Sequence, residues 1–98
     1  MINGFKVITL CGSTRFKDEF LEAQKRLTLE SNVVITVGLF GHSGDDVVWT
    51  EGVKEMLDRQ HLAKIDLADE IFVINVGGYI GDSTRREVAY AELKNRLL

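Results

Sequence analysis

The sequence contains a single cysteine, Cys11, and no proline among its 98 residues. One cysteine excludes an internal disulfide and suits a reducing compartment, so we expect a cytoplasmic protein. Its apolar runs are too short for a membrane-spanning helix, and the N-terminus lacks the pattern of a signal peptide. A net charge of −3 does not favour binding to nucleic-acid polymers or to anionic membranes. The expected class is a soluble globular protein.

Short β-branched runs alternate with longer amphipathic stretches along the chain. They predict strands at residues 5–11, 33–37 and 70–75, and helices at about residues 15–30, 50–67 and from 84 onwards. The second helix is expected to turn four apolar side chains inward, namely Val53, Met56, Leu57 and Ile65. One core fits this length, so residues 1–98 form a single domain. The alternation predicts an α/β fold, a Rossmann- or flavodoxin-like three-layer sandwich with a small parallel sheet in the order 2-1-3.

In such a sheet, ligands bind beyond the carboxyl ends of the strands, where the strand order reverses. The loop after the first strand offers groups that suit a phosphate or a sugar hydroxyl. Gly12 permits close backbone approach, Ser13 and Thr14 carry hydroxyls, and Arg15 adds a fork of donors near a helix start. The structural alternative is a tight turn in which Ser13 or Thr14 caps the helix.

The loop after the third strand carries Gly77, Gly78 and Gly81, which leave the backbone unobstructed near a ligand. Three polar residues follow at the predicted helix N-terminus, whose partial positive charge favours an anion. They are Asp82, Ser83 and Thr84.

Glu87 follows one turn into this helix and is the candidate catalytic group. The residues from Thr84 to Glu87 also fit a capping box, in which the Glu87 side chain would accept from the Thr84 N–H. Local spacing favours the cap, whereas the glycines before it favour a binding loop, because a cap does not need them.

With these residues the chain resembles the nucleoside 2-deoxyribosyltransferase-like family, which includes the deoxynucleoside 5′-monophosphate N-glycosidases. The resemblance covers most of the chain and includes small phage and bacterial proteins with a Gly-Gly-Tyr-Ile-Gly-x-Ser-Thr-x-x-Glu loop. The loop is also similar to a motif of the cytokinin-activating phosphoribohydrolases, which cleave a similar bond. The matching segments are residues 11–15, Ala68-Asp69, and residues 77–87 with Tyr90-Ala91 after them.

The resemblance implies that Glu87 attacks the anomeric carbon and forms a glycosyl ester, which is then passed to water or to another base. Residues 12–15 together with Ser83 and Thr84 would match the family's phosphate and sugar contacts. It also implies a nucleotide or nucleoside as partner, a homodimer or higher homo-oligomer, and no metal or cofactor. The family's sheet continues with one more strand after the last helix, whereas this sequence ends at Leu98, where that strand would begin. The edge of the third strand would then be bare.

Three positions depart from the family pattern: a tyrosine falls on Thr9, an aspartate on His61, and the transferase aspartate on Gly81. His61 is a candidate for the missing acid because its pKa lies near neutrality, although its spacing also suits a histidine at the edge of the core. The glycine favours a 5′-monophosphate substrate and hydrolysis over transfer. The expected function is therefore a nucleotide N-glycosidase or deoxyribosyltransferase. The alternative is a nucleotide-binding domain without catalysis.

Overall fold

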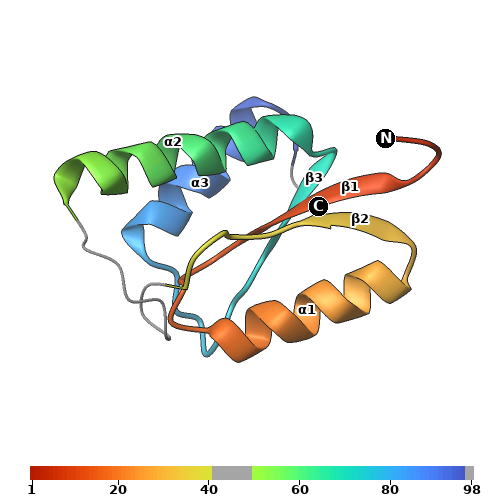
Figure 1. The fold of residues 1–98 in the computed structure, drawn as a ribbon, viewed down its shortest axis with the longest axis horizontal. Helices are drawn as coiled ribbons and strands as arrows, with labels where there is room; N and C mark the ends of the chain where they lie inside the picture. Colours follow the sequence, from red (N-terminus) through yellow and green to blue (C-terminus); the bar gives the residue numbers. More distant parts are fainter. Residues whose placement is uncertain (41–49, 97–98) are drawn as a thin grey trace.

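The computed structural model describes residues 1–40 and 50–96. Within them, strands alternate with helices (Figure 1): β1 (Lys6–Cys11), α1 (Lys17–Leu29), β2 (Asn32–Ile35), α2 (Glu51–Leu67), β3 (Glu70–Val73) and α3 (Asp82–Leu93). The predicted elements are all present. A loop was predicted over residues 38–46, of which residues 41–46 lie outside the described part of the chain.

The sheet is parallel and has the predicted order, β2-β1-β3. β1 is its central strand, with Val7 opposite Val33 on one side and Thr9 opposite Ile71 on the other. Because helices cover both faces of β1, every residue from Val7 to Cys11 is buried. This double burial explains why nearly every position of the strand is apolar.

Helices cover the two faces of the sheet unequally, with α1 on one face and both α2 and α3 on the other (Figure 1). Successive residues of β1 therefore pack in different layers. Leu10 packs with Phe20 of α1, whereas Cys11 packs with Ile65 of α2 and Ala91 of α3. The predicted three-layer α/β sandwich is confirmed.

Two predictions about helix surfaces and strand edges were wrong. Met56 was expected to face inward, but its residue is 38% exposed. The free edge of β3 is not bare, because the Ile71 N–H donates to the Arg96 carbonyl at 2.6 Å. The chain after α3 thus contacts the edge of β3 at this residue. Among the described residues, no helix combines the length and apolar character that crossing a membrane requires.

Candidate functional site

The loops after β1 and β3 meet at the carboxyl end of the sheet, where they border a cavity of about 640 Å³. This volume lies within the range of roughly 300–1,000 Å³ that is usual for small-molecule sites. All ten site residues expected from the sequence line it: Gly12, Ser13, Thr14, Arg15, His61, Gly81, Asp82, Ser83, Thr84 and Glu87. The structure therefore brings these residues together. Their roles toward a ligand stay predictions.

Close packing explains the glycine that ends β1. A Cβ added at Gly12 would lie 2.8 Å from Cβ of Ile74, closer than real Cβ contacts, and the Ile74 N–H donates to the Cys11 carbonyl at 2.7 Å. Neither Ser13 nor Thr14 caps α1, whose N-cap is Phe16. The expected cap is therefore wrong, although the tight turn is present, in which the Phe16 N–H donates to the Ser13 carbonyl at 3.1 Å. Ser13 and Thr14 both border the cavity.

The two adjacent glycines after β3 have a different role from the predicted one. Gly77 and Gly78 have φ of +60° and +81° and form a tight turn, closed by the Tyr79 N–H donating to the Val76 carbonyl at 3.0 Å. Left-handed backbone of this kind favours glycine. Neither glycine borders the cavity, whereas Gly81 does, as the N-cap of α3. Backbone conformation, rather than approach to a ligand, accounts for the pair.

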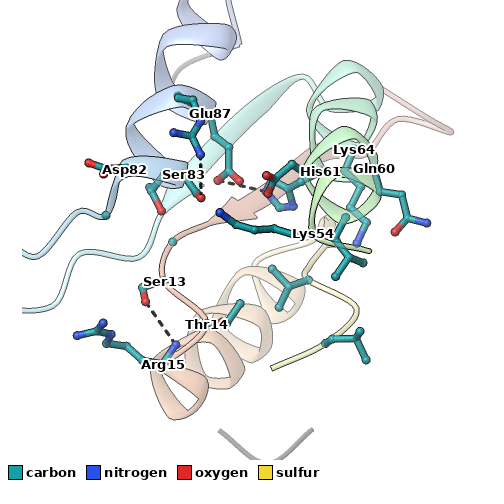
Figure 2. A pocket seen from close by; sticks show the side chains of 18 of the residues that line it. Ser13, Thr14, Arg15, Lys54, Gln60, His61, Lys64, Asp82, Ser83 and Glu87 are labelled. Carbon is teal, nitrogen blue, oxygen red and sulfur yellow. Dashed lines mark hydrogen bonds and ion pairs between the residues drawn. The ribbon is translucent and has the colours of Figure 1, made fainter. Parts of the chain in front are cut away.

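The capping-box interpretation of Glu87 was also wrong. α3 begins at Asp82, two residues before the predicted start, so Thr84 lies inside the helix and is buried. The N-cap of α3 is Gly81, which has no side chain with which to cap the helix. The Glu87 carboxylate instead faces His61 of α2 (Figure 2).

Glu87 lies next to His61 and Cys11 at the carboxyl end of β1. Figure 2 shows Glu87 of α3 and His61 of α2 facing each other, with their nearest atoms, Oε1 and Nε2, 3.7 Å apart. The same Nε2 is 3.3 Å from the Cys11 Sγ, and the thiol sulfur, the imidazole and a Glu87 carboxylate oxygen all lie within 4.8 Å of one another. The side chains of His61 and Glu87 are only 9% and 14% exposed.

Burial changes the protonation of this cluster. It raises the pKa of Glu87 to about 7, and the negative charge of Asp58 adds to the effect. It lowers the pKa of His61 to about 4, with help from the positive charge of Lys64. Burial also raises the pKa of the Cys11 thiol, as does the nearby Glu87 charge. At neutral pH the imidazole and thiol are therefore uncharged, and the Glu87–His61 contact is not an ion pair.

Several lining residues were missed by the sequence analysis, and half of them lie on α2. Lys54, Asp58 and Lys64 border the cavity together with His61. Successive members of this set are three or four residues apart, which places them on one face of a helix. The spacing was visible in the sequence, but only the packing of α2 shows that this face borders the cavity. Thr9, where the family has a tyrosine, is buried and donates to the Lys64 carbonyl at 2.8 Å.

Charged groups of both signs surround the cavity. Its basic side chains are Arg15, Lys54, Lys64 and Arg86, and its acidic ones are Asp58, Asp82 and Glu87. Figure 2 shows Lys54 reaching from α2 toward the end of β1. Among the described residues, no hydrogen bond or ion pair engages the Lys54 ammonium. Such a site can hold an anion near its cations and the α3 N-terminus, with a carboxylate nearby for chemistry.

Arg15 is held at the opposite rim of the site. Its guanidinium stacks on the Tyr79 ring at 4.4 Å from the centroid, and Phe16 packs against the same ring in a T-shaped arrangement. Stacking of this kind restricts the orientation of a guanidinium while leaving its N–H donors in its own plane. Tyr79 also borders the cavity and is 42% exposed, so it offers an aromatic surface there.

Comparison with known proteins identified no relative of this chain. No protein-family model, no curated protein and no solved structure matches the chain.

Proposed function

We propose that this protein is a nucleotide N-glycosidase that cleaves the base–sugar bond of a nucleoside 5′-monophosphate, with Glu87 as the nucleophile. The observation that supports it most is the position of Glu87, whose largely buried side chain borders the same cavity as the start of α3. A phosphate near that helix start and Lys54 would leave the sugar within the cavity, toward the carboxylate.

In the proposed reaction, an Oε atom of ionised Glu87 forms a bond to the anomeric carbon as the carbon–nitrogen bond to the base breaks. The departing base takes up a proton. Water then attacks the glycosyl ester, which returns the carboxylate and releases the sugar phosphate. Asp58 lines the cavity and is a candidate for moving these protons. The acid role of His61 is less favourable, because a pKa of about 4 leaves the ring neutral at pH 7.

The resemblance to the nucleoside 2-deoxyribosyltransferase-like family supports the same proposal. Through it we also propose a homo-oligomer in which a neighbouring chain completes the site. Base release that increases with protein concentration more steeply than in proportion, together with a dimer mass by light scattering, is the expected result. A monomer with full activity at every concentration contradicts this part of the proposal alone.

The direct test is incubation with a panel of nucleoside 5′-monophosphates, followed by chromatography of the released base. Glu87→Gln is expected to reduce base release by a factor on the order of 10³, since it removes the nucleophile and keeps the shape of the side chain. Glu92→Gln, on the same helix but exposed, is the matched control and should retain activity. Base release that persists in the Glu87→Gln variant contradicts the proposed nucleophile.

The second candidate is a nucleotide-binding domain without catalysis. The neutral imidazole of His61 favours it, because a poor acid leaves the departing base without a ready proton source. The expected result is then a nucleotide-dependent rise in unfolding temperature without base release. Base release by the wild-type protein excludes this candidate.

A further inference from the structure

Three side chains of different chemistry meet at the inner wall of the cavity. Cys11 ends β1, His61 lies in α2 and Glu87 lies in α3, so the three come from separate elements of the fold. Each offers one metal-ligating atom, and these atoms all lie within 4.8 Å of one another. Thiolate, imidazole and carboxylate are the three ligand types that Zn²⁺ uses in proteins.

Two of the three separations among these atoms are close to those in a tetrahedral zinc centre. Zinc–sulfur and zinc–nitrogen bonds of about 2.3 and 2.1 Å place two such ligands about 3.6 Å apart, and nitrogen and oxygen ligands about 3.4 Å apart. The observed separations are 3.3 Å between Cys11 and His61 and 3.7 Å between His61 and Glu87. Side-chain shifts of a few tenths of an ångström would bring these two pairs to the required spacing.

The imidazole is already oriented for this role. Its Nε2 atom lies 3.3 Å from the Cys11 Sγ and 3.7 Å from a Glu87 carboxylate oxygen. One ring nitrogen therefore faces both of the other side chains, as a shared metal ion requires.

We propose that Cys11, His61 and Glu87 together bind one Zn²⁺ ion, whose fourth coordination position opens into the cavity. Two of the ligands, His61 and Glu87, border that cavity, which provides the route of entry. On binding, the Cys11 thiol loses its proton to solvent and the sulfur–zinc bond forms, without any change of oxidation state. This inference goes beyond the proposed function, because an ion that occupies the Glu87 carboxylate makes it unavailable as a nucleophile. Zinc would therefore inhibit the glycosidase.

Cobalt provides a spectroscopic test that needs no nucleotide. The protein, first freed of metal with a chelator, is titrated with Co²⁺ while the near-ultraviolet thiolate-to-cobalt charge-transfer band is recorded. Since Cys11 is the chain's only cysteine, the band reports on this site alone. We expect it to saturate at one ion per chain and to disappear when Zn²⁺ displaces Co²⁺. Absence of the band in the wild-type protein overturns the proposal.

Variants test the other two ligands by calorimetric titration with Zn²⁺. His61→Gln and Glu87→Gln are each expected to weaken binding by at least about tenfold, in protein whose fold is checked by circular dichroism. Glu92→Gln, at an exposed position of α3, should bind as the wild type does. Unchanged affinity in both ligand variants shows that the thiol binds alone and overturns the proposed site. A protein that does not bind zinc can still release base, and a protein that does not release base can still bind zinc. The two proposals can therefore be judged separately.

Discussion

Replacing Glu87 by Gln is expected to change how the stability of the protein depends on pH. The folded-state pKa of Glu87 is raised from 4.5 to about 7, so its contribution to stability is present below pH 4.5 and lost as the pH rises through 7. The pKa of His61 is lowered from 6.5 to about 4, so its contribution is present above pH 6.5 and lost as the pH falls through 4. Each contribution amounts to about 3 kcal/mol, because one pKa unit corresponds to about 1.4 kcal/mol.

Between pH 4.5 and 6.5, the Glu87 contribution to the free energy of unfolding falls as the pH rises, whereas the His61 contribution increases. The two changes therefore largely cancel in the wild-type protein. The variant removes one of them. Relative to wild type, Glu87→Gln should gain about 3 kcal/mol of unfolding free energy as the pH rises from 4.5 to 7. His61→Gln should gain a similar amount as the pH falls from 6.5 to 4.

Urea denaturation at a series of pH values, with a chelator present, measures both profiles. The difference between variant and wild type is the informative quantity, because titration of all other groups cancels in it. Glu92→Gln serves as the control and should give a difference that does not vary with pH. A flat difference for Glu87→Gln would refute the argument, since it would mean that the carboxyl group titrates alike in the folded and unfolded chains.

Three further predictions concern packing, rate and binding. Gly12→Ala should lower the free energy of unfolding by about 1–3 kcal/mol, because the new Cβ would lie 2.8 Å from a side chain after β3; Gly52→Ala, with nothing within 4 Å, should cause no loss in the same urea experiment. Base release should increase with pH through about 7 as Glu87 ionises, and Asp58→Asn should move this increase to lower pH in a kcat/KM profile, because the Asp58 charge raises the pKa of Glu87. Lys54→Gln should weaken binding of a nucleoside 5′-monophosphate more than binding of the nucleoside itself, as calorimetry would show; equal losses contradict a phosphate role.

The layered fold was predictable because each element buries a pattern that local spacing reveals. The stripe of Phe20, Ala23 and Leu27 repeats at helical spacing, and all three side chains are buried on one face of the sheet. The continuous apolar run of β1 similarly indicated a strand covered on both faces. Once the strands are parallel, their carboxyl ends share one edge, so the two loops had to come together.

The set of residues that line the site depends on tertiary packing, which local sequence patterns do not reveal. Thr84 and Glu87 have the spacing of a capping box, but α3 begins at Asp82 and its N-cap is Gly81. The missed residues Lys54 and Asp58 belong to the site because α2 packs with one face toward α3. The contact of Cys11 with His61 joins residues 50 positions apart, so it could not be read from sequence spacing.

Burial of Glu87 has a cost that the fold itself does not explain. As part of a capping box, the carboxylate would lie near solvent and add stability. In its buried position, the raised pKa of Glu87 corresponds to a loss of about 3 kcal/mol in the free energy of unfolding at neutral pH. The neighbouring His61 carries no charge that would offset this loss. Glutamine would have the same shape without that loss. A titratable group held at such cost beside a cavity is typical of a functional site, where stability is given up for activity. The combined expectation for Glu87→Gln is therefore higher stability above pH 7 together with loss of base release, an outcome that a purely structural glutamate would not produce.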